Sequence, residues 1–135
     1  MKHTVISNPE GKLLALDVYG CSFQVLNCPE FLIREATLAA HKAGMRVLAI
    51  TMVPFEPQGL SLVLILGESH LTIHTAPEFG YAGVDVYTCG GGNPMAAVDH
   101  LLKVLNPDAV RVKEQRRGMF PVAEEMQLRS NTVAR

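Results

Sequence analysis

The side chains best suited to chemistry lie at the junction of two apolar segments near the middle of the chain. An unbroken apolar run from Leu60 to Leu66 passes directly into Gly67-Glu68-Ser69-His70, and His74 and Cys89 follow. A serine between a carboxylate and an imidazole, where two buried strands are expected to meet, is unusual because polar side chains are seldom buried without partners or a function. This stretch is therefore the best candidate for a reactive site.

Two familiar chemistries fit these residues poorly. His70 and His74 have the HxxxH spacing that binds zinc from one face of a helix, but the threonine and isoleucine between them favour a strand. On a strand the pair lies roughly 13 Å apart, too far to share an ion whose ligands lie at about 2 Å, so we expect no metal. Ser69 also lacks the GxSxG turn that exposes the nucleophile of many serine hydrolases.

A phosphate site is a further alternative. Gly90-Gly91-Gly92 precede Asn93-Pro94, where a helix is expected to begin, and helix starts attract anions. The run lacks the lysine of a P-loop, and a role in a turn is the commoner explanation for such glycines.

The remaining chemistry is internal to the chain. The Ser69 hydroxyl can attack the carbonyl of Glu68 where the backbone is strained and the tetrahedral intermediate is stabilised. The amide becomes an ester, and loss of the Ser69 α-proton then expels the Glu68 carboxylate and leaves dehydroalanine, which hydrolyses to a pyruvoyl group. The chain is thereby cut into residues 1–68 and 69–135. The new ketone forms a Schiff base with a substrate amine and accepts the electrons released with carbon dioxide.

The alternation of side chains along the expected strands groups several polar residues. In residues 81–89 the odd positions, which include Asp85 and Cys89, form a polar face, and in residues 70–75 His70 and His74 share a face. Two neighbouring strands are therefore expected to bring His74, Asp85 and Cys89 towards one polar surface.

These motifs resemble a known family. GESHLTIHTAPEFGYAGVDVYTCG, at residues 67–90, is similar to the cleavage and active-site segment of the prokaryotic S-adenosylmethionine decarboxylase proenzymes, small pyruvoyl-dependent enzymes of polyamine biosynthesis. EPQGLS at 56–61, residues 13–44 and residues 94–118 follow the same pattern. The resemblance implies a cytoplasmic carboxy-lyase with a two-layer fold, usually a homodimer with active sites near the interface.

The resemblance also implies which residues perform the cleavage. Ser69 is the pyruvoyl precursor, and Glu68 becomes the C-terminus of the 1–68 chain. Ser61 and His74 assist the cleavage, with His74 as the base that removes the α-proton.

Decarboxylation and substrate binding involve a second set of residues in the family. Cys89 is expected to donate the proton that quenches the decarboxylated carbon. Phe55 is expected to stack on adenine, with His74 near its opposite face, and Glu78 to bind the ribose hydroxyls.

Departures from the family pattern concern the substrate. Ala76 stands where the family usually has tryptophan, Val53-Pro54 replace His-Arg, and Gly11-Lys12-Leu13 replace Gly-Arg-His. Loss of an indole removes a large contact surface, and Glu78 can also bind a guanidinium group. L-arginine or L-ornithine is therefore slightly favoured as the substrate over S-adenosylmethionine, the family default. A third alternative is an unprocessed, non-catalytic paralogue that regulates an active subunit.

Hydrophobic periodicity predicts an α/β (α+β) fold for residues 1–135 as a single domain. Both helices are expected on one face of a largely antiparallel sheet, in a two-layer α/β sandwich whose other face a second protomer covers. His41 and His100 are expected at the surface, residues 1–12 as a loose leader and residues from Lys113 as a mobile tail. The expected helices span 29–44 and 94–105, and the expected strands span 13–19, 46–53, 60–66, 71–75, 81–89 and 109–112.

Composition excludes several classes of partner. A net charge of −1 with mixed signs argues against nucleic acid, and no apolar run approaches the ~20 residues that span a bilayer. The beginning of the chain lacks the apolar core of a signal peptide. Three cysteines without framework spacing fit a reducing compartment. We expect a cytoplasmic protein whose ligand is a small amine or amino acid.

Overall fold

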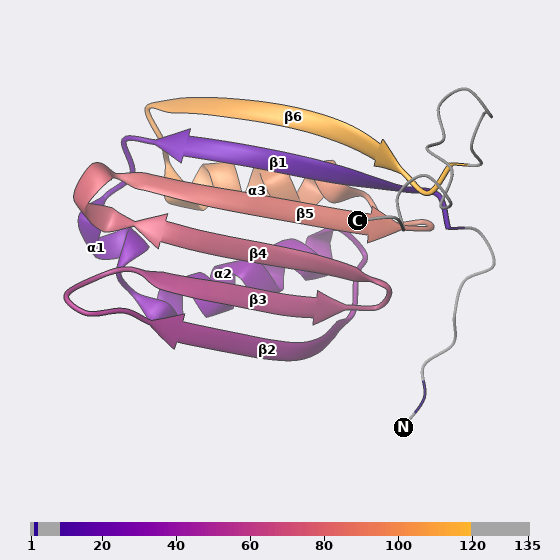
Figure 1. Cartoon of the computed structure of the whole chain (residues 1–135), viewed down its shortest axis with the longest axis horizontal. Helices are drawn as coiled ribbons and strands as arrows, with labels where there is room; N and C mark the ends of the chain where they lie inside the picture. The colour runs from indigo at the N-terminus through magenta and orange to yellow at the C-terminus, as the bar shows by residue number, and fades with distance from the viewer. Residues whose placement is uncertain (1, 3–8, 120–135) are drawn as a thin grey trace, which may run out of the picture.

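Six strands form one antiparallel sheet in the order β2-β3-β4-β5-β1-β6 (Figure 1). The computed structural model describes residue 2 and residues 9–119. The strands are β1 (Gly11–Tyr19), β2 (Val47–Pro54), β3 (Leu60–Leu66), β4 (Ser69–Ala76), β5 (Tyr81–Cys89) and β6 (Ala109–Arg117). The helical elements are α1 (Phe23–Leu26), α2 (Pro29–Lys42), the 3-10 turn η1 (Pro77–Phe79) and α3 (Pro94–Leu105).

The helices all lie behind one face of the sheet in Figure 1, so the predicted two-layer sandwich is confirmed. Alternate residues of β3, β4 and β5 point into the helix-covered core, as their burial pattern shows. The core is almost wholly aliphatic, and its largest fully buried side chains include Leu62, Leu64, Leu71 and Ile73. Burial of this apolar layer is the main force that holds α2 and α3 against the sheet.

Local signals set the ends of the two long helices. Pro29 and Pro94 each occupy the first turn, where a missing N–H costs nothing. Glu30 adds a negative charge to the positive end of α2. Asn106, with a φ of 47°, ends α3 in the left-handed conformation that asparagine tolerates better than most residues.

The prediction that His100 lies at the surface is wrong. His100 is only 8% exposed, and its Nε2 lies 3.0 Å from Oε1 of Glu35, which is also buried. Lys42 Nζ lies 2.9 Å from Nδ1 of the same ring. Lys42 and Glu35 both belong to α2, so the imidazole fills a polar gap between the two helices instead of facing solvent. His41 is exposed, as predicted.

The predicted tail is wrong for its first residues, because β6 continues to Arg117 alongside β1. The side chains of β6 are exposed along its whole length, so hydrophobic periodicity carries no signal there. The strand is held mainly by its pairing with β1. The predicted leader is likewise too long, since β1 begins at Gly11. The leader prediction for residues 1 and 3–8, and the tail prediction for 120–135, lie outside the described residues.

The second face of the sheet carries no helix (Figure 1). It is partly apolar, and Ile65 and Val53 on it are 51% and 47% exposed. Among the described residues, no helix is both long and apolar enough to cross a bilayer.

Candidate active site

The Glu68–Ser69 bond lies in a tight, strained turn between β3 and β4. Leu66 and Ser69 are paired across the hairpin, so Gly67 and Glu68 alone form the connection. Glu68 has a φ of 58°, and a non-glycine residue held in this left-handed region carries about 1–3 kcal/mol of strain. The strained residue is therefore the one whose carbonyl precedes the candidate nucleophile.

Ser69 is held next to Cys89, the last residue of β5. The Ser69 side chain faces the helices and is 8% exposed. Its Oγ accepts a hydrogen bond of 3.3 Å from the backbone N–H of Cys89. The hydrogen bond fixes the hydroxyl at the beginning of β4 against the backbone of Cys89, whose thiol lies on the other face of the sheet.

The Cys89 thiol has its own partner on the uncovered face. It donates to the Tyr87 hydroxyl, with 3.3 Å between Sγ and the oxygen. The Tyr87 ring lies 5.5 Å from the ring of His70, and the Arg117 guanidinium lies 5.9 Å from its centre. The hydrogen bond with Cys89, together with burial, raises the pKa of Tyr87. The phenol therefore stays protonated at neutral pH.

A cavity of about 310 Å³ opens on the uncovered face next to this pair. Its lining mixes a carboxylate, two rings and a guanidinium, which gives polar groups of both signs around Tyr87. The lining residues are Leu13, His70, Asp85, Tyr87 and Arg117.

A second group of predicted site residues lies around the other end of β4. Ser61 and His74 are paired across β3 and β4, and Ser61 Oγ lies 2.7 Å from His74 Nδ1. The Phe55 side chain is 51% exposed, just after β2. Glu78, in η1, accepts a hydrogen bond of 2.7 Å from Gln58 Nε2. These four residues lie at the same end of the sheet, where Gln58 binds Glu78.

The two groups lie at opposite ends of the sheet. In Figure 1 the β3–β4 turn and the end of β5 lie at the right, whereas the β2–β3 connection and η1 lie at the left. His74 is paired with Gly83, six residues before Cys89, which is roughly 20 Å at ~3.3 Å per residue. His74, Asp85 and Cys89 share one face of the sheet, as expected, but they lie well apart along it. Asp85 lies midway, where Thr72 donates to it at 3.4 Å.

Two residues of this site were missed by sequence reasoning. Tyr87 was visible as an odd position of the polar face, but its bond to Cys89 depends on the side-chain geometry at the end of β5. Gln58 lies in a loop without periodicity, so no sequence signal pointed to its contact with Glu78. In the described part of the chain, no three histidine, cysteine or acidic side chains are grouped so that they could hold a metal ion.

Comparison with known proteins gives consistent matches. A family model described as S-adenosylmethionine decarboxylase matches residues 12–118. The S-adenosylmethionine decarboxylase proenzyme of Brevibacillus brevis is 43% identical over 110 residues, covering 81% of this chain and 83% of that protein. The proenzyme of the same name from Clostridium kluyveri is 40% identical over 120 residues, covering 88% of this chain and 95% of that protein. The crystal structure of the adenosylmethionine decarboxylase from Aquifex aeolicus superposes with a TM-score of 0.73 at 30% identity, covering 90% of this chain and 100% of that one.

Proposed function

Because the chain belongs to the S-adenosylmethionine decarboxylase family, whose members are pyruvoyl-dependent carboxy-lyases, we propose that it cuts itself between Glu68 and Ser69 and then decarboxylates S-adenosylmethionine. The strained Glu68–Ser69 turn, with the Ser69 hydroxyl held beside Cys89, is the observation that carries this proposal. The chain is an enzyme, and the alternative of a non-catalytic regulatory paralogue has no support. A cytoplasmic location remains part of the proposal.

The turn favours cleavage in two ways. Strain at Glu68 raises the energy of the uncleaved chain, and cutting the bond releases it. The backbone N–H of Cys89 orients Ser69 Oγ, so the hydroxyl does not need to search for its position before attack. The attack forms the Oγ–carbon bond and breaks the Glu68–Ser69 amide. Elimination then releases the Glu68 carboxylate, and water displaces ammonia to leave the ketone.

The surroundings of Ser69 fit a pyruvoyl group. The side chain is buried against the helices, which limits access of water to a carbonyl at this position. The pyruvoyl carbonyl would condense with the substrate amine and accept the electrons released with carbon dioxide. Cys89 would supply the proton at the substrate carbon, and Tyr87 would keep the thiol in position.

The two separated groups of residues support a dimer as the active form. Ser69 and His74 are five residues apart on one strand, roughly 16 Å, so His74 of the same chain is too distant to remove the Ser69 α-proton. A twofold axis crossing the strands would lay the turn end of one sheet over the loop end of another. Ser61, His74, Phe55 and Glu78 of one chain would then complete the Ser69 site of its partner, and the contact would cover exposed Ile65.

The substrate follows from the relatives and from the retained contacts. Relatives at 40–43% identity are named as S-adenosylmethionine decarboxylase proenzymes. Phe55 is exposed at the loop end and free to stack on a purine, and Glu78 is fixed there by Gln58. The comparisons give no support to L-arginine or L-ornithine, which the substitutions at Ala76 and Val53-Pro54 had favoured.

A release assay separates these substrates. We expect carbon dioxide from carboxyl-labelled S-adenosylmethionine, with the labelled arginine and ornithine at least about 100-fold slower because neither supplies an adenosine for the Phe55 and Glu78 contacts. A Phe55→Ala variant should raise the KM for S-adenosylmethionine and leave cleavage of the chain intact. Turnover of arginine or ornithine at a rate equal to or above that of S-adenosylmethionine would refute the substrate assignment.

The contact between Tyr87 and Cys89 makes a separate prediction. We expect Tyr87→Phe to cleave normally and to lower kcat about tenfold with little change in KM, because the thiol loses the group that orients it. Tyr81→Phe is the matched control, since its hydroxyl donates to Asp17 at the far end of the same strand. Equal kcat values for the two variants would assign Tyr87 a purely structural role.

A further inference from the structure

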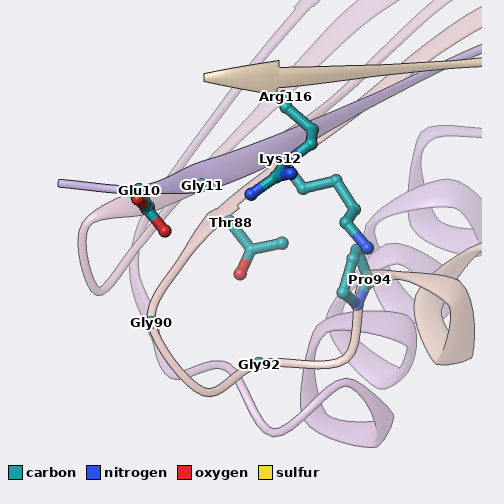
Figure 2. A pocket seen from close by; sticks show the side chains of 8 residues that line it. All are labelled: Glu10, Gly11, Lys12, Thr88, Gly90, Gly92, Pro94 and Arg116. Atoms are coloured by element: carbon teal, nitrogen blue, oxygen red, sulfur yellow. The ribbon is translucent and has the colours of Figure 1, made fainter. Parts of the chain in front are cut away.

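A pocket of about 230 Å³ lies on the helix side of the sheet, with Thr88 in its lining, and the chemistry proposed above makes no use of it. Figure 2 shows Lys12 and Arg116 on one side of this pocket, and the Gly90–Gly92 loop with Pro94 on the other. The Thr88 side chain lies between these two sides.

Strand register connects the pocket to Ser69. Arg116 is paired with Lys12 across β6 and β1, and Lys12 is paired with Thr88 across β1 and β5. His70 and Tyr87 are paired across β5 and β4, so the next position along places Ser69 beside Thr88. Two cationic side chains and a hydroxyl therefore form a row that leads across the sheet to the residue proposed to become the pyruvoyl group.

The hydroxyl of Thr88 lacks a partner. Thr88 is 4% exposed, and its side chain makes no hydrogen bond within the part of the chain that the structure describes. No polar side-chain atom in that part is both buried and without a partner, so the Thr88 oxygen keeps access to the pocket that it lines. A ligand in the pocket can therefore accept a hydrogen bond from this hydroxyl without displacing an existing one.

The opposite wall also favours a negative ligand. It is the start of α3, a helix of 12 residues, where the helix dipole is positive. The loop that leads into it approaches Thr88 closely, because a Cβ on Gly92 would lie 3.1 Å from Thr88 Oγ1. The absence of a side chain at Gly92 keeps the space in front of the hydroxyl open.

Acidic groups near the pocket limit the charge it can take. Lys12 Nζ lies 3.4 Å from the Glu114 carboxylate, with both side chains about half exposed, and Glu10 is part of the lining. Arg116 and the helix start are the remaining positive groups. This balance suits one small anion and not a polyanion.

We propose that this pocket binds a single small oxyanion, held by Arg116, Lys12, the Thr88 hydroxyl and the start of α3. The ligand is either the carboxylate of the substrate, which must lie near Ser69 for the reaction, or a free anion such as sulfate or phosphate. The first source rests on the proposed function, whereas the second does not.

The test measures the thermal midpoint of the full-length chain against sodium sulfate, with sodium chloride holding the ionic strength constant. The uncleaved Ser69→Ala protein is used, so the result does not depend on self-cleavage or activity. We expect a saturable rise in the midpoint, in contrast to the gradual rise that sulfate causes by exclusion from protein surfaces.

Variants locate the effect. Arg116→Met and Thr88→Val should each weaken sulfate binding about tenfold, and Glu10→Gln should strengthen it. Thr88→Val should leave the midpoint without sulfate nearly unchanged, since the hydroxyl makes no hydrogen bond that the substitution would remove. Arg111→Met, on the same exposed strand and outside the lining, is the charge-matched control and should respond like the parent. A non-saturable response, or a response unaltered in Arg116→Met and Thr88→Val, would overturn the proposal.

Competition then identifies the source of the anion. If the pocket takes the substrate carboxylate, S-adenosylmethionine should raise the sulfate concentration needed for half-saturation, and its decarboxylated product should not. If neither compound displaces sulfate, the pocket is a site for a free anion. Failure of the proposed decarboxylation would leave the sulfate result intact, so the two proposals fail separately.

Discussion

Ser69→Ala is expected to remain a single chain of 14.7 kDa and to lose decarboxylase activity by about four orders of magnitude or more. The substitution removes the hydroxyl proposed to attack the Glu68 carbonyl, and with it the proposed source of the pyruvoyl ketone. Effects of this size are typical when a nucleophile is removed. Denaturing intact mass reports the cleavage, and release of labelled carbon dioxide reports the activity.

The structural cost of this change should be small. Alanine loses the 3.3 Å hydrogen bond from the Cys89 N–H, which is worth about 1 kcal/mol, so the variant should still fold. Ser22→Ala is a matched control, because that serine is exposed and caps α1 away from the turn. We expect it to cleave fully. A Ser69→Ala protein cut at the same bond would refute the proposed origin of the ketone.

The second large effect concerns mixtures of two inactive chains. Ser69→Ala lacks the nucleophile and His74→Ala lacks the proposed base, so each homodimer should be inactive. In a heterodimer of the two, one site combines Ser69 of the His74→Ala chain with His74 of the Ser69→Ala chain. That site is complete, and the purified heterodimer should have about half the wild-type activity per dimer.

Mass spectrometry gives this experiment a direct readout, because only the His74→Ala chain should be cut in the heterodimer. Differential tags identify the chains. A double Ser69→Ala, His74→Ala chain paired with wild type is the control, and it should leave no complete site in the dimer. Cleavage of the His74→Ala homodimer, or an uncut His74→Ala chain in the active mixture, would contradict a shared site.

The fold was largely predictable because this sheet is simple in pattern. The run from Leu60 to Leu66 and the alternation in residues 81–89 follow directly from burial of one sheet face. Pro29 and Pro94 mark the helix starts for equally local reasons. The predicted last strand ends at residue 112, too early, because all the side chains of β6 are exposed and give no hydrophobic pattern. The burial of His100 was missed because it depends on Glu35, which lies 65 residues away in sequence.

The site was predictable in its membership and not in its geometry. The alternation of odd and even positions along β4 and β5 identified the sheet face on which His74 and Cys89 lie, because side chains alternate between faces in any strand. This alternation carries no information on how the strands are aligned with each other. The antiparallel register places His74 and Cys89 towards opposite ends of the sheet. The family resemblance identified the reacting residues individually. The resemblance did not identify which of these residues lie at the same end of the sheet within one protomer.

The most direct test of self-cleavage and pyruvoyl chemistry is the intact mass of the denatured protein after borohydride reduction with S-adenosylmethionine, arginine or ornithine in separate samples. Two fragments are expected, 1–68 and 69–135, with the reduced amine adduct on the second fragment and only in the S-adenosylmethionine sample. An unmodified single chain near 14.7 kDa in every sample would contradict the account.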